Sequence, residues 1–240
     1  MQESAAMLRT LPLVLAIGCA SESLETTPCD EASDTLEQCT GQVPDGFREA
    51  CAADPETVAS TVLAEADAPS CVADGKADGL DKTVFVGGCS ALVNAAFWVV
   101  WARSPAGEPL SPELKRQLRP WYGDLVDVVR VSWNSPFVTD WHVFGRDLSF
   151  DKHLAGQTFG DTIYVRDAAS DDLATFLLMG HELRHVVQYR ERGGIAGFAR
   201  AYCTAFYDAS YSYTNNQLEV EARAAALEIK TCLALGSGCP

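Results

Sequence analysis

Two histidines and a glutamate stand within five consecutive residues, in the order His181-Glu182-Leu183-Arg184-His185. Side chains four residues apart lie above one another on the same face of a helix, so His181 and His185 can bind one metal ion. Glu182 directly follows the first histidine, which places its carboxylate beside the open coordination position of that metal. There it can accept a proton from a bound water, whose pKa zinc lowers to about 7. The motif therefore predicts a zinc site for hydrolysis, with Glu182 as the general base.

The surroundings of this motif favour a metal site over a chance match. Two of the four histidines of the chain have this spacing. They lie inside a long helix that we expect to be capped by Ser170-Asp171-Asp172 and to end at Arg192, before two glycines. The alternative is a pair of histidines that is buried in a core, or exposed on a helix face, without any metal.

A third ligand must come from elsewhere, because a catalytic zinc needs three protein ligands and one open position. We expect it from a later helix at 217–235, which carries Glu219 and Glu221. At about 100° per residue these two carboxylates point about 200° apart, so only one can face the metal. Glu219 lies closer to the apolar stripe of the helix and is the predicted ligand. The alternative is that both carboxylates are solvated charges.

The rest of the chain predicts the elements that must position these side chains. Strands are expected at 127–133 and 162–166, which are rich in β-branched residues. Helices are expected at 111–121 and 196–208, in addition to the two that carry the predicted ligands. These elements predict helices and a small sheet, followed by an all-helical C-terminal part.

An apolar stretch at 83–102 is long enough to suggest a membrane span. Two glycines, Ser90 and Asn94 interrupt it, so we expect a buried helix at 89–101 and keep the membrane span as the alternative.

Residues 155–165 read Ala-Gly-Gln-Thr-Phe-Gly-Asp-Thr-Ile-Tyr-Val, and residues 181–188 read His-Glu-Leu-Arg-His-Val-Val-Gln. Together they resemble the zincin-like domain associated with extracellular contractile injection systems, which pairs a glycine-containing strand with a helix of this motif. The helix at 114–122 and the segment Val-Val-Arg-Val at 128–131 are similar to the helix and strand that open that domain. The resemblance covers about residues 110–226, roughly half of the chain.

This resemblance implies an α+β, zincin-like fold, with a small sheet packed on the His-Glu-x-x-His helix. It implies that the strand at 162–166 lies at the sheet edge, where an extended peptide would pair with it. Glutamate-type zincins carry their ligand glutamate three residues before an alanine, as Glu219 precedes Ala222. The chain departs from the family pattern at Arg184 and Tyr189, and neither residue is a predicted ligand.

The N-terminus has the features of an export signal. A short charged start precedes the apolar residues 11–17, and Cys19 follows closely. This segment is too short to span a bilayer and predicts a secretory signal over residues 1–19. Residues 16–19, Ala-Ile-Gly-Cys, also resemble a bacterial lipobox, whose cysteine is lipidated. We therefore expect an exported protein, either a cell-envelope lipoprotein anchored to the membrane through Cys19 or a secreted protein with an ordinary signal peptide. The alternative for this segment is a buried N-terminal helix.

The net charge of −15 is concentrated in residues 20–80, which hold 14 Asp or Glu against 2 Lys or Arg. This stretch predicts an acidic, cysteine-containing tether with one short helix near 55–66. Its charge would repel phosphates, which argues against nucleic acid as a partner. Eight cysteines follow Cys19, and an even number in an exported chain predicts disulfides, with a second metal site as the alternative. They are Cys29, Cys39, Cys51, Cys71, Cys89, Cys203, Cys232 and Cys239.

Residues 81–240 are expected to form a zincin-like metallopeptidase domain. The predicted function is that of an exported zinc-dependent metallopeptidase that hydrolyses peptide bonds in protein or peptide substrates. The alternative is a catalytically silent zincin-fold module on the cell envelope, whose zinc only holds the fold while its surface binds another component. Glu182 favours the enzyme, because a structural zinc site needs no general base. Tyr207, Tyr211 and Tyr213 are candidates for stabilising an oxyanion, with core packing as the alternative.

Overall fold

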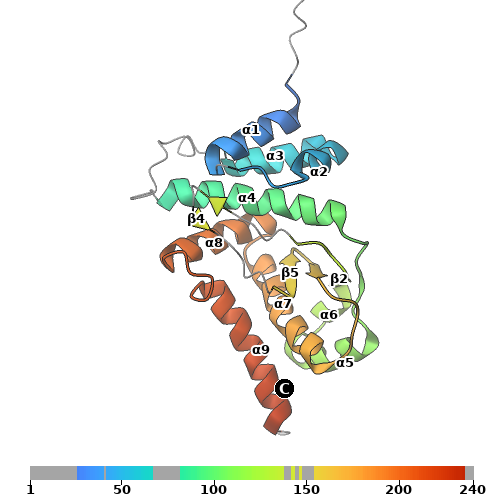
Figure 1. Ribbon diagram of the computed structural model, residues 1–240. Coiled ribbons are helices and arrows are strands. Elements are labelled where there is room, and N and C mark those ends of the chain that lie inside the picture. The colour runs from blue at the N-terminus through green and yellow to red at the C-terminus, as the bar shows by residue number, and fades with distance from the viewer. Residues whose placement is uncertain are drawn as a thin grey trace, which may run out of the picture.

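The computed structural model describes residues 26–40, 42–66, 82–137, 142–143, 146–147 and 154–235 (Figure 1). The described chain is mixed α+β, mostly helical, with a small four-stranded sheet. The elements that follow strand β6 are all helices, as the sequence predicted for the C-terminal part. The predicted signal segment, with Cys19, lies outside the described residues.

The described ranges contain nine helices and six strands. The helices are α1 (Pro28–Thr40), α2 (Phe47–Ala53), α3 (Pro55–Ala66), α4 (Lys82–Arg103), α5 (Pro112–Tyr122), α6 (Leu125–Val128), α7 (Leu173–Glu191), α8 (Ile195–Asp208) and α9 (Gln217–Leu235). The strands are β1 (Glu108–Pro109), β2 (Arg130–Ser132), β3 (His142–Val143), β4 (Arg146–Asp147), β5 (Gly156–Phe159) and β6 (Thr162–Val165).

Helices α1 to α3 form a packed layer on one side of α4, where the sequence predicted a tether (Figure 1). Leu36 and Phe47 are buried in this layer and share a hydrophobic cluster with Ala91 and Ala95 of α4. The acidic composition of this stretch suggested a solvated tether. Its few apolar residues are nevertheless spaced so that they fall on common helix faces, and these faces pack together. The predicted helix near 55–66 is confirmed as α3.

Two disulfides join helices within the described residues. Cys29 and Cys51 link α1 to α2, and Cys89 and Cys203 link α4 to α8. These pairs confirm the predicted use of four of the cysteines, and they are consistent with an oxidising environment.

Helix α4 lies at the centre of the core. It is long and apolar enough to cross a membrane, but 78% of its most apolar window is buried inside the protein. It packs against α1 to α3 on one side and against α8 on the other (Figure 1). The predicted buried helix is therefore confirmed. It begins earlier than expected, at Lys82, in a first turn where Phe85 stacks on Phe206 of α8.

The four-stranded sheet has the order β1-β2-β6-β5. Strands β2 and β6 run parallel, and the other neighbouring strands run antiparallel. Ile163 of β6 pairs with Val131 of β2 on one side and with Thr158 of β5 on the other. The expectation that the strand at 162–166 forms the sheet edge is therefore wrong. A tight turn at Gly160, with φ of 61°, folds β5 back along β6 and makes β5 the outermost strand on that side of the described sheet.

The predicted strand at 127–133 is only partly present. Its first residues belong to the single helical turn α6, and strand β2 begins at Arg130. Arg119 of α5 donates hydrogen bonds of 2.8 and 2.9 Å to the Asp127 carboxylate. This partly exposed ion pair joins the start of the segment to α5.

Helix α7 carries the predicted zinc motif and spans nearly the residues expected from the sequence. The Asp172 side chain caps it by accepting a hydrogen bond of 2.8 Å from the Thr175 backbone N–H. One face of α7 packs on the sheet, and another packs on α9. A Cβ at Gly180 would lie only 2.6 Å from Ile229 Cδ1, so the absence of a side chain there lets α9 approach closely.

Candidate metal centre

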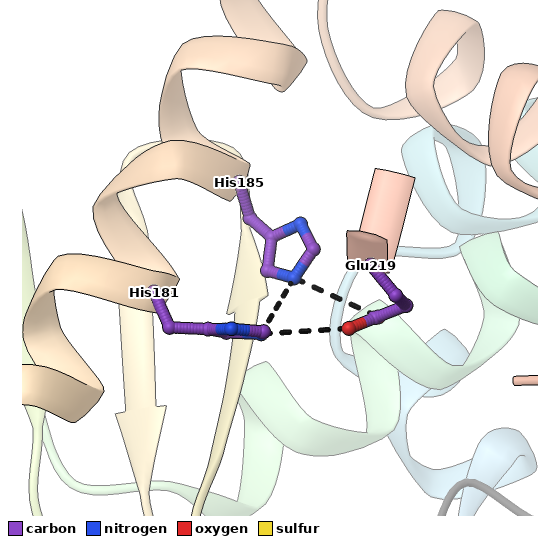
Figure 2. Close-up of side chains that lie close together, drawn as sticks. All are labelled: His181, His185 and Glu219. Carbon is purple, nitrogen blue, oxygen red and sulfur yellow. Dashed lines mark hydrogen bonds and ion pairs between the residues drawn. The ribbon is translucent and has the colours of Figure 1, made fainter. Parts of the chain in front are cut away.

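Three side chains from two helices converge on one point (Figure 2). His181 and His185 project from successive turns of α7, and Glu219 projects from the first turn of α9. The two Nε2 atoms lie 3.1 Å apart. Glu219 Oε2 lies 3.4 Å from His181 Nε2, and Glu219 Oε1 lies 3.6 Å from His185 Nε2. The structure thus brings together the three residues that the sequence singled out as metal ligands.

These spacings fit a shared metal ion. A tetrahedral zinc with Zn–N bonds of about 2.0–2.1 Å holds two nitrogen ligands about 3.3 Å apart. Glu219 Oε2 is buried and accepts no hydrogen bond from any residue in the described part of the chain. A buried carboxylate oxygen without a donor is costly, and a cation beside it would remove that cost. The residues present therefore fit a zinc ion.

The charges of the three groups are strongly coupled. Burial alone would lower the pKa of His185, but the adjacent Glu219 carboxylate outweighs burial and raises that pKa to about 9. Burial would raise the pKa of Glu219, but His185 and His181 outweigh it and hold this pKa well below its usual range. The site therefore keeps a buried carboxylate ionised and attracts positive charge, as a metal site must.

Glu182 lies beside the three convergent residues and is also buried. Thr158 of β5 donates a hydrogen bond of 2.7 Å to Glu182 Oε2. Gly156, on the same strand, leaves room for the carboxylate, because a Cβ there would lie 2.7 Å from Glu182 Oε1. Strand β5 therefore sets where this carboxylate lies.

The ligands and Glu182 open into one cleft, with a cavity of about 70 Å³. This exceeds the roughly 10–15 Å³ that a cavity needs to hold one water, so a metal-bound water has room beside Glu182. Apart from the ionisable groups just described, the walls are mainly apolar and aromatic. They include Val93, Leu154, Phe159, Tyr189, Phe198, Tyr202 and Tyr213.

Comparison with protein-family models, with curated proteins and with solved structures finds no match to this chain.

The structure separates the two glutamates of α9. The Glu219 side chain is 6% exposed and faces the histidines, whereas the Glu221 side chain is 31% exposed and faces Arg184. Arg184 Nη2 lies 3.0 Å from Glu221 Oε2. Glu219 and Glu221 thus point to different sides of α9, as expected for two residues about 200° apart around a helix.

The three tyrosines considered for oxyanion stabilisation lie in different places. Tyr207 and Tyr211 pack with Phe85 in the aromatic core, which agrees with the alternative kept for them. Tyr213 lines the cleft. Burial and the nearby Glu219 carboxylate raise the pKa of Tyr213, so its hydroxyl stays protonated and can donate a hydrogen bond.

Two functional neighbours of the ligands were missed from the sequence. Tyr202 OH donates a hydrogen bond of 3.1 Å to Glu219 Oε1. Gln188 Oε1 lies 2.8 Å from His185 Nδ1. Gln188 stands three residues after His185 on α7, so helical spacing could have suggested this contact. Tyr202 comes from a different helix, and nothing in the sequence points to it.

Proposed function

We propose that this protein is a zinc-dependent metallopeptidase of the zincin type. The observation that carries the proposal is the convergence of His181, His185 and Glu219 in the cleft that also holds Glu182. Three ligands with a fourth position open to a cleft are the arrangement of a catalytic zinc, whereas structural zinc sites are closed by four protein ligands. The likeness of residues 155–165 and 181–188 to the zincin-like domain supports the same conclusion.

Six residues of the cleft have a part in the proposed peptide-bond hydrolysis. His181, His185 and Glu219 would hold the zinc, which supplies a Lewis acid and an acidified water. Glu182 accepts a proton from the attacking water and delivers it to the amine that leaves when the C–N bond breaks. Thr158 orients the Glu182 carboxylate through its hydrogen bond. Tyr213 donates a hydrogen bond to the oxygen that becomes negative as water adds to the carbonyl.

The substrate is an extended peptide that lies along β5. This strand lines the cleft and is the outermost strand on its side of the described sheet. An extended peptide can add to such a strand through main-chain hydrogen bonds. The walls formed by Val93, Phe159 and Phe198 carry no charge, so they suit an apolar side chain next to the bond that is cleaved.

The protein acts outside the cytoplasm. The two disulfides are consistent with an oxidising environment. The N-terminal segment 1–19 supports export, and Cys19 supplies a site for lipid attachment to the cell envelope.

Metal analysis and peptide cleavage on the same purified protein test this proposal. We expect one zinc per chain and cleavage of a mixed peptide library beside apolar residues, abolished by a chelator and restored by zinc. Glu182→Gln should keep the zinc and lose about 10²–10⁴ of the activity, which is what a positioned proton transfer contributes. Stoichiometric zinc without cleavage of any peptide would point instead to the silent module, in which zinc only holds the fold.

A further inference from the structure

Glu221, the glutamate that does not face the histidines, lies at the centre of a second set of contacts. Its Oε2 accepts hydrogen bonds of 3.0 Å from Arg184 Nη2 and of 3.0 Å from Gln188 Nε2. Gln188 Oε1 in turn lies 2.8 Å from His185 Nδ1. A continuous chain of polar contacts therefore runs from Arg184 through Glu221 and Gln188 to His185.

The orientation of the Gln188 amide is decided by its surroundings. Gln188 is fully buried, and its nitrogen lies 3.0 Å from two groups that can only accept, the Leu218 carbonyl and the Glu221 carboxylate. Turning the amide over would place its oxygen against both of these acceptors. The oxygen of Gln188 must therefore face His185.

This orientation determines which nitrogen of His185 carries a proton. An amide oxygen accepts but cannot donate, so Nδ1 of His185 must carry the hydrogen that bonds to it. The imidazole that binds a metal is neutral and has one N–H, so with that hydrogen on Nδ1 the lone pair is on Nε2. Nε2 is the atom that faces Glu219 and His181.

We propose that Glu221 and Gln188 form a positioning relay that fixes His185 as the Nδ1–H tautomer and so directs its Nε2 lone pair at the metal. The proposal rests on the zinc site proposed above. It gives the two glutamates of α9 different tasks: Glu219 is a ligand, and Glu221 orients the amide that orients a ligand. Arg184 compensates the charge of Glu221 and ties α7 to α9, the two helices that supply the ligands.

Substitutions with a matched control separate this role from a general effect of charge or packing. Gln188→Met nearly keeps the volume and removes all three side-chain contacts, to His185, the Leu218 carbonyl and Glu221. Glu221→Gln and Glu228→Gln make the same change of charge on α9, but Glu228 is exposed and lies outside the relay.

The experiment measures zinc affinity by chelator competition and the exchange of the His185 Nδ1 proton by nuclear magnetic resonance. We expect Gln188→Met to bind zinc about 10–100-fold more weakly, as is usual when the outer partner of a ligand is lost. Its Nδ1 proton should exchange faster, with and without zinc. Glu221→Gln should weaken zinc binding more than Glu228→Gln, because only Glu221 contacts Gln188.

Two results would overturn the relay. One is a folded Gln188→Met with wild-type zinc affinity and an unchanged Nδ1 proton. The other, which applies even if Gln188→Met does not fold, is that Glu221→Gln and Glu228→Gln have equal zinc affinities and equal Nδ1 exchange. Failure of the zinc proposal is distinguishable, because wild-type protein would then bind no zinc while the Nδ1 exchange still reports on the relay.

Discussion

The Thr158 hydroxyl donates a 2.7 Å hydrogen bond to Glu182 Oε2, and this bond joins strand β5 to the helix that carries both histidines. The proposed general base is therefore held by the same strand along which we place the substrate. The same strand would then position both the base and the substrate, which favours a productive geometry for attack on the carbonyl.

Replacing this hydroxyl should impair catalysis without affecting the metal. Thr158→Val has the same shape but cannot donate, and a hydrogen bond to a charged group is worth about 1.5–3 kcal/mol. We expect kcat to fall about 10-fold or more, with zinc content unchanged. Thr158→Ser, which keeps the hydroxyl, is the control and should retain most of the activity. Equal kcat values for the valine and serine variants would exclude this role of Thr158.

A methyl group at Gly156 should displace the general base. The added Cβ would lie 2.7 Å from Glu182 Oε1, closer than carbon and oxygen can approach, and Thr158 holds the other carboxylate oxygen. We expect Gly156→Ala to bind zinc normally and to lose most of its peptidase activity. The neighbouring exposed residue provides a control, Ala155→Ser, which should be fully active. Wild-type activity in Gly156→Ala would show that the carboxylate does not depend on this gap.

The stability of the zinc-free protein should fall as the pH rises from about 6.5 to about 9. Burial opposes protonation of His185, but Glu219 outweighs burial and raises the folded-state pKa from 6.5 to about 9. A proton held more tightly in the folded state stabilises it fully below about pH 6.5, and this contribution is lost as the pH rises through about 9.

Urea unfolding of chelator-treated protein at several pH values measures this effect. The free energy of unfolding should decrease across that window, and His185→Gln should lack this part of the slope. Zinc displaces the same proton, so zinc affinity should increase over the same range. An identical slope in wild type and His185→Gln would assign the pH dependence to other groups.

The two disulfides should differ in their effect on the site. Cys89 and Cys203 join α4 to α8, and the next residue of α8 on the N-terminal side, Tyr202, donates to Glu219. Replacing both cysteines by alanine should cost about 2–4 kcal/mol of stability and weaken zinc binding. Removing the pair that joins α1 to α2 should destabilise the protein while leaving zinc affinity unchanged. Equal zinc affinity in both double variants would show that the Cys89–Cys203 disulfide does not affect the metal centre.

The sequence was most informative where a single helix determines the geometry. The spacing of His181 and His185 placed both on one face of α7, and the apolar stripe of α9 turned Glu219 rather than Glu221 inward. Both inferences need only 100° per residue, and the structure agrees with each.

Contacts between distant segments could not be predicted in this way. The bond from Thr158 to Glu182 spans 24 residues, and the bond from Gln188 to Glu221 spans 33. The order of strands in the sheet is also a tertiary property, so the likeness to a known family misplaced 162–166 at the edge that β5 occupies. The average acidity of residues 20–80 concealed the packed layer of α1 to α3, whose apolar residues are few but regularly placed.

The assignment of Glu219 as the third ligand is tested most directly by zinc titration of three proteins, namely wild type, Glu219→Ala and Glu221→Ala. We expect wild type to bind one zinc per chain and Glu219→Ala to lose stoichiometric binding, because two histidines alone remain. Glu221→Ala should still bind one zinc, with reduced affinity. Loss of zinc from Glu221→Ala with retention by Glu219→Ala, or a wild-type protein that binds no zinc, would contradict the metal centre proposed for this protein.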